Sequence, residues 1–220
     1  MDNKRTPPSI WHGQLLHLIS LVILLITSWL SWTYVDKPLM PFFWLAITIP
    51  IVHQVFVWLS WRFELRSSLT SQFLGFKGYL VIFFILFGSR FLALLTLAWL
   101  DRGSLGLQML PQTVISMMLL LPGMYAMYSV KRYFGMSRAA GADHFDPGYR
   151  TMPLVRRGMF RFTGNAMYVY AFLLFWAIAI GFNSSAALIV AAFSHLYIWV
   201  HFYCTEKPDM DYIYGADEGQ

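Results

Sequence analysis

The amino-acid sequence predicts an all-α integral membrane protein with about six transmembrane helices. Hydrophobic residues make up 58% of its 220 residues and charged residues only 12%, whereas about 25% of the residues are charged in an ordinary soluble domain. The mean hydropathy is +0.54, and the apolar residues form long runs. Because lipid offers no partner to backbone polar groups, we expect helices rather than an open sheet.

Four apolar runs are each long enough to cross a bilayer once. They cover Leu15–Tyr34, Leu39–Trp61, Gly78–Leu100 and Leu107–Val130. A helix rises 1.5 Å per residue, so about 20 residues cross a hydrocarbon core of about 30 Å. The first three runs form the N-terminal spans within residues 1–105.

A fifth apolar region, Ala166–Tyr203, is too long for one span and is interrupted by "GFNSS" at Gly181–Ser185. Gly, Asn and Ser commonly end helices, so the last two helices are expected to form a hairpin at this turn. We expect a single membrane domain over residues 1–220, whose second half covers residues 106–215.

Lysine and arginine are distributed unevenly between the two sides that these spans define. Thirteen of them lie in the N-terminal tail, the second connection, the 131–161 segment and the C-terminal tail, and only Lys37 and Arg102 lie on the opposite side. Connections on the cytoplasmic side carry the excess of positive charge. The sequence therefore predicts that both termini and the candidate active site are cytoplasmic.

The segment 131–165 is polar, rich in Gly and Pro, and interleaved with aromatic residues. Loops of this length are usually functional or disordered, and the aromatic residues favour order. We expect an ordered cytoplasmic loop just before the hairpin.

Several other kinds of protein are excluded. The net charge of +5 could indicate nucleic acid, but the basic residues flank apolar spans, where membrane topology explains them. The six histidines are scattered, and His195 and His201 lie on different helical faces, so no metal site is expected and His195 is expected to be hydrogen-bonded inside the bundle. The single cysteine, Cys204, excludes an intramolecular disulfide framework.

Charged groups from two distant segments are expected to converge at one cytoplasmic mouth. They are Arg156, Arg157 and Arg161 with Asn165 from the loop, and His201, Glu206, Asp209 and Asp211 from the last span. The Asn165 side chain suits a cap for the fifth helix, whose N-terminus favours an anion. The alternative is that Asn165 serves only as a helix cap and that the arginines only set the membrane topology.

Two charged residues have both a functional and a structural interpretation. Glu206 could hold an ammonium or sulfonium group or act as a base, or it could be a solvated acid paired with Lys207. Arg90 is the one basic residue deep in a span, where charge is costly and often functional. It could line a headgroup pocket, pair with a buried carbonyl or acid, or extend to the membrane surface.

Three motifs in the second half carry a family resemblance. They are "GMFRFTGNAMYVY", with Gly158, Phe160, Arg161, Phe162, Asn165, Met167 and Tyr168; "CTEKPDMDYIYG", with Glu206; and "LLLPGMYAMY", with Gly123. Together they resemble the membrane methyltransferases that include isoprenylcysteine carboxyl methyltransferases and phospholipid N-methyltransferases. The resemblance covers residues 120–215.

The resemblance implies a transferase of lipid metabolism that uses S-adenosylmethionine and acts on a lipid or lipophilic acceptor, with a phospholipid amine favoured. It implies cofactor contacts at Asn165, Tyr168, Met167, Glu206, Phe160 and Gly123. Candidate catalytic residues are Glu206, His201 and Arg161, and candidate acceptor-binding residues are Arg157, Arg90 and His144.

Three alternatives stay open. One is a carboxyl methyltransferase of the prenylcysteine type. Another is a non-catalytic membrane protein that retains the scaffold, because Ala166 and Tyr170 replace a family proline and glycine and Glu206 matches only one acid of a pair. The third is a transporter, which would need more polar residues in the middle of the spans.

Overall fold

The computed structural model describes residues 6–35 and 39–215, and every regular element in these ranges is a helix. The predicted all-α fold is therefore confirmed. Lys4, Arg5 and Lys37, which enter the charge count, lie outside the described residues. Five apolar helices have the length of membrane spans: α1 (Gln14–Tyr34), α2 (Met40–Ser67), α4 (Gly75–Leu100), α5 with η1 (Met109–Phe134), and α10 with η4 and α11 (Ser185–Tyr214).

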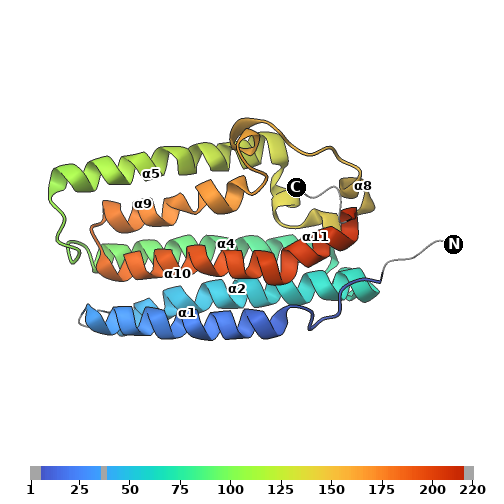
Figure 1. Ribbon diagram of the computed structural model, residues 1–220, viewed down its shortest axis with the longest axis horizontal. Coiled ribbons are helices and arrows are strands. Elements are labelled where there is room, and N and C mark those ends of the chain that lie inside the picture. The colour runs from blue at the N-terminus through green and yellow to red at the C-terminus, as the bar shows by residue number, and fades with distance from the viewer. Residues whose placement is uncertain (1–5, 36–38, 216–220) are drawn as a thin grey trace.

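The two ends of the bundle differ. Figure 1 shows one, which we call the loop end, at the right and the other, the turn end, at the left. At the loop end, residues 135–166 connect α5 to the next apolar helix, and α3 (Leu69–Phe73) connects α2 to α4. At the turn end lie the connections 101–108 and 182–184. The loop-end connection contains four short helices: α6 (Met136–Ala139), α7 (Ala142–Phe145), α8 (Pro147–Arg150) and η2 (Gly158–Arg161).

The sixth apolar segment is shorter than a span. It consists of η3 (Met167–Ala171) and α9 (Leu173–Gly181), and it has fewer than 18 residues. At 1.5 Å per residue it covers at most about 26 Å, against about 30 Å of hydrocarbon core. Figure 1 shows α9 inside the bundle, joined to α10 at the turn end. The count of six spans therefore stays a prediction.

Small side chains let α10 (Ser185–His201) pack at the centre of the bundle. Ala186, Ala187 and Ala191 are fully buried, and they share a core with Ala179 of α9. In lipid there is no hydrophobic force between helices, so close packing of small residues is what stabilises their association. This places α10 against α1, α2, α4 and α9.

Gly123 allows a close approach between α5 and α9. A Cβ atom at this position would lie 2.8 Å from Leu174 Cδ2 and 3.2 Å from the Leu174 backbone nitrogen. The contact of Gly123 in this structure is therefore with a neighbouring helix.

Gly123→Val is expected to lower the unfolding free energy by about 1–3 kcal/mol, the usual effect of overpacking. Gly88→Val is the matched control, because a Cβ at Gly88 meets nothing within 4 Å. Denaturant unfolding of the detergent-solubilised protein measures both. Equal midpoints for the two variants would contradict the close contact with Leu174.

An acidic residue organises the turn end. Asp101 is 7% exposed, and its Oδ2 accepts hydrogen bonds from the hydroxyls of Ser104 (2.7 Å) and Ser184 (2.6 Å) and from the Ala186 N–H (2.9 Å). Ala186 lies in the first turn of α10, where a negative charge is favourable. The "GFNSS" turn is thus fixed by an acid that the sequence analysis did not single out.

Asp101→Ala is expected to lower the unfolding free energy by about 1.5–3 kcal/mol, the usual contribution of hydrogen bonds to a charged group. Asp101→Asn should lose less, because its amide oxygen still accepts. Asp146→Ala is the control, since the Asp146 side chain accepts from Gly148 in an exposed turn. A loss at Asp146 as large as that at Asp101 would contradict the assignment.

Candidate functional site

Tyr168 and Glu206 meet at the loop end of the bundle. Tyr168 lies in η3, at the start of the short apolar segment, and Glu206 ends η4 (Phe202–Glu206), which continues α10. The two segments run in opposite directions, so the start of one lies beside the end of the other. The Tyr168 hydroxyl donates a hydrogen bond to Oε2 of Glu206. Within the described residues Oε1 has no hydrogen-bond partner, and it is free to accept from a ligand.

Helix geometry also distinguishes the loop end. All three π-helical elements of the described chain lie there: η1 (Val130–Phe134) extends α5, η3 precedes α9, and η4 extends α10. π-helical turns are rare and often occur at functional sites. Their concentration around Tyr168 and Glu206 marks this end as the candidate functional site.

A cavity lies beside Tyr168, between the N-terminal helices and the second half of the chain. It contains about 730 Å³ free of atoms, its open mouth included. Its walls are mainly apolar, with the rings of Phe83, Phe84 and Phe87 on one side and the side chains of Met127, Met136 and Met167 on the other. Apolar ligand pockets usually carry a few polar groups that orient the ligand.

Three polar side chains of the cavity wall have no partner among the described residues. Arg90 is 5% exposed, His53 is 3% exposed and His201 is 1% exposed. Both ring nitrogens of each histidine, and Nε and Nη2 of Arg90, lack a hydrogen bond. Since buried polar groups are normally satisfied, these are the atoms that a ligand in the cavity would meet.

Thr205, the residue before Glu206, is fixed to two helices of the N-terminal half. Gln14 donates from Nε2 to the Thr205 hydroxyl (3.2 Å), and Arg62 donates from Nη2 to the Thr205 carbonyl oxygen (3.4 Å). The His17 ring contacts Gln14 Oε1 at 3.0 Å. The N-terminal half therefore positions the backbone that carries Glu206.

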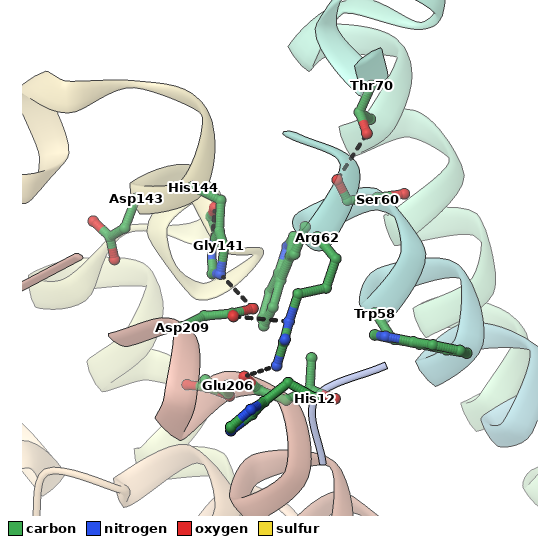
Figure 2. Close-up of polar contacts among 12 residues, drawn as sticks. His12, Trp58, Ser60, Arg62, Thr70, Gly141, Asp143, His144, Glu206 and Asp209 are labelled. Atoms are coloured by element: carbon green, nitrogen blue, oxygen red, sulfur yellow. Dashed lines mark hydrogen bonds and ion pairs between the residues drawn. The ribbon is translucent and has the colours of Figure 1, made fainter. Parts of the chain in front are cut away.

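A buried ion pair holds α11 (Lys207–Tyr214) against α2 and the loop. Figure 2 shows Asp209 between the Arg62 guanidinium and the His144 ring. Arg62 Nε lies 2.8 Å from Asp209 Oδ1, and His144 Nε2 lies 3.4 Å from Oδ2, all three side chains being fully buried. Arg62 also donates to the Ser9 carbonyl oxygen (2.6 Å), which ties the chain before α1 to the same end.

Aromatic side chains extend this cluster to the cavity. The His144 ring stacks on Trp61 with centroids 4.1 Å apart. Trp61 Nε1 donates to the Tyr79 hydroxyl (2.9 Å), which donates to the Ala140 carbonyl oxygen (2.7 Å). These contacts fix α6, whose Met136 lines the cavity.

The structure brings together five of the predicted site residues. Tyr168, Met167, Arg90 and His201 line the cavity, and Glu206 is bonded to Tyr168.

The other predicted site residues do not line the cavity, and within the described chain no hydrogen bond or ion pair joins them to the Glu206 side chain. Phe160 is buried and stacks on Phe134 at 4.9 Å, and His144 is held by Asp209 and Trp61. Arg157 and Arg161 are exposed, and the Arg161 guanidinium lies 5.4 Å from the Phe162 ring centroid. Gly123 contacts Leu174, and Asn165 precedes η3.

The loop arginines and the C-terminal acids lie at the same end of the bundle, but no ion pair among the described residues joins them. Arg156, Arg157 and Arg161 are exposed and form no ion pair with the described acids. The basic partner of Asp209 is instead Arg62 of α2. Asp209 is buried between α2 and the loop.

Two expectations about single residues, Asn165 and Glu206, are wrong. The Asn165 side chain does not cap the helix; instead its carbonyl oxygen accepts from the N–H groups of Tyr168 and Val169, both at 3.0 Å. The alternative pairing of Glu206 with Lys207 does not occur, because Lys207 lies 3.5 Å from Asp211.

The hydrogen bond expected for His195 is confirmed, since Trp176 Nε1 donates to its Nδ1 (3.0 Å). The described residues contain no group of three or more His, Cys, Asp or Glu placed to hold a metal ion.

The contribution of α2 to the site was not predicted from the sequence. His53 resembled any of six scattered histidines, and Arg62 was counted as a loop residue because the apolar run ends at Trp61. The structure extends α2 to Ser67, which places Arg62 inside the helix. The sequence signal for Arg62 was its position directly after an apolar run.

Residues 111–217 match the family model of phospholipid methyltransferases. The match contains Tyr168, Glu206 and His201, whereas α1, α2 and α4 lie outside it. Comparison with curated proteins and with solved structures gave no match. The resemblance seen in the sequence is thus confirmed for the second half of the chain, which is similar to phospholipid methyltransferases.

Proposed function

We propose that the protein is an integral membrane methyltransferase that uses S-adenosylmethionine to methylate the amine of a lipid acceptor, with a phospholipid favoured. The observation that carries the proposal is the hydrogen bond from Tyr168 to Glu206 beside an apolar cavity. It joins two motifs of the matched region that lie 38 residues apart in the sequence.

The residues present fit the chemistry of this cofactor. Oε1 of Glu206 can accept from an ammonium group, and the aromatic rings of the cavity wall suit a sulfonium, because cations are attracted to ring faces. Met167 and Tyr168 supply apolar surface next to Glu206. S-Adenosylmethionine, when bound, supplies an electrophilic methyl group.

The side chains around the cavity would position the reactants and exclude water. Tyr168 fixes one oxygen of Glu206, and the other has no hydrogen-bond partner among the described residues. An amine acceptor must lose a proton before its nitrogen can attack, so a base is required. The contacts of His144 with Asp209 and Trp61 leave Glu206 and His201 as the candidate bases. The mainly apolar wall favours direct approach of the two reactants over competing water.

We further propose that the loop end of the bundle faces the cytoplasm. Arg66, Arg138 and Arg150 lie at this end, and the excess of positive charge in the sequence marks the cytoplasmic side. A pocket at the membrane surface is where a water-soluble cofactor and a lipid acceptor can both arrive.

The test is transfer of labelled methyl groups from S-adenosylmethionine into a total lipid extract, followed by mass analysis of the product. A label in amine phospholipids is the expected result. A label released as a methyl ester would favour the carboxyl methyltransferase. No transfer, together with no binding of S-adenosylhomocysteine at millimolar concentration, would identify a non-catalytic protein.

A further inference from the structure

The guanidinium of Arg90 on α4 is a buried polar group of the cavity wall. Its central carbon lies 5.3 Å from the ring centroid of Phe172 and 5.5 Å from that of Phe175. The side chain is 5% exposed, and its Nε and Nη2 form no hydrogen bond with the residues that the structure describes. The ion pairs among the described residues involve other groups, so no carboxylate compensates Arg90.

Two histidines add further polar atoms to the same cavity. His53 of α2 packs edge-on against Phe83 with centroids 4.7 Å apart, and His201 of α10 lies 5.7 Å from Trp61 between ring centroids. Within the described chain no ring nitrogen of either histidine has a hydrogen-bond partner. Among the described residues that line the cavity none is acidic. The wall therefore combines one fixed positive charge and several free nitrogens with apolar surface.

From this arrangement we infer that the cavity binds the phosphate of the acceptor lipid, with Arg90 as its principal ligand and with His53 and His201 as additional donors. A guanidinium presents several N–H groups in a planar fork that matches phosphate oxygens. The phenylalanines of α4 would contact the apolar part of the same lipid. The assignment of this lipid as the acceptor rests on the proposed methyl transfer, whereas binding of the phosphate does not.

This inference assigns acceptor recognition to the N-terminal half. Arg90 and His53 lie on helices outside the family match, which begins at residue 111. The two halves meet at the cavity, so the matched half would hold the cofactor and the unmatched helices would select the acceptor.

Binding can be measured on the detergent-solubilised protein with three probes: dihexanoyl phosphatidylethanolamine, dihexanoylglycerol and inorganic phosphate. We expect the phospholipid to bind more tightly than the other two. Arg90→Gln should weaken its binding about 10- to 100-fold, the effect of losing a charge-assisted hydrogen bond. Arg102→Gln is the matched control, because Arg102 is exposed at the turn end and lies over the Trp99 ring.

Each other outcome overturns the inference. Equal binding of dihexanoylglycerol would show that the cavity does not recognise phosphate. Equal binding of inorganic phosphate would show a small-anion site instead of a lipid site. An unchanged affinity of Arg90→Gln for the phospholipid would place the phosphate elsewhere.

A stability measurement separates ligand binding from a structural role. A buried charge without a partner is costly, so an apolar residue of similar size in its place is expected to be neutral or stabilising. Arg90→Met should therefore keep or raise the thermal midpoint of the ligand-free protein while it loses phospholipid binding. A lowered midpoint in the ligand-free protein would make Arg90 structural and would overturn the inference.

The two proposals can fail separately. Binding of S-adenosylhomocysteine tests the proposed cofactor site, and Arg90→Gln should leave it unchanged. If phospholipid binds through Arg90 but methyl transfer is absent, the phosphate site stands and the proposed reaction fails.

Discussion

Glu206→Gln is expected to lower the rate of methyl transfer by about 100-fold or more, the usual range for losing a positioned acid or base. Glutamine keeps the size of the side chain and the acceptor oxygen for Tyr168, but it carries no negative charge. The variant side chain can therefore neither stabilise the ammonium group of the cofactor nor accept a proton from the acceptor. Methyl incorporation from labelled S-adenosylmethionine into lipid measures the loss.

Two further measurements on Glu206→Gln separate its possible roles. A loss of S-adenosylhomocysteine affinity would show that Glu206 holds the cofactor's ammonium. Unchanged affinity with a lowered turnover rate would show that it acts as the base. Asp211→Asn is the matched control, because Asp211 is half-exposed and pairs only with Lys207 on its own helix. Activity lost equally in both variants would contradict the assignment of Glu206.

Tyr168→Phe should have a smaller effect, about tenfold, which corresponds to about 1.4 kcal/mol for one hydrogen bond that only orients Glu206. The ring stays in place, since phenylalanine keeps its contacts with Phe202 and Trp199. A loss as large as that of Glu206→Gln would mean that the hydroxyl itself contacts a reactant.

The helices could be predicted from the sequence because each is determined by the composition of its own segment. An apolar run in lipid has to satisfy its own backbone, so composition and length suffice to predict α1, α2, α4 and α5. The bounds of α2 were wrong at its end for the opposite reason. Arg62 lies inside that helix and fully buried, and its charge is compensated by Asp209, which is far along the chain.

The candidate site was predicted in part for a similar reason. Tyr168 and Glu206 could be paired because the turn "GFNSS" reverses the chain and returns it to the loop end. The histidine at position 53 had no local signal, since its place in the cavity depends on how α2 packs against α4 and α10. The role of the exposed arginines could not be predicted, because a positive charge in a loop near the membrane indicates topology as readily as binding.

Removing one partner of the buried pair between Arg62 and Asp209 is expected to lower the unfolding free energy by about 3–5 kcal/mol. Asp209→Ala leaves a fully buried guanidinium without its carboxylate, and it also removes the contact with His144. The exposed pair of Lys207 and Asp211 is the control, for which Lys207→Ala should cost only about 0.3–0.5 kcal/mol. Denaturant unfolding in detergent measures both variants.

The double variant Arg62→Met with Asp209→Leu should regain most of the stability, because no charge is then left buried without a partner. It should not regain methyl transfer to the same extent. Arg62 also donates to the carbonyl oxygen of Thr205, the residue before Glu206, and methionine cannot replace that bond. A stable double variant with full activity would show that the N-terminal half does not position Glu206. A double variant as unstable as Asp209→Ala would instead show that the ion pair is not the source of the stability.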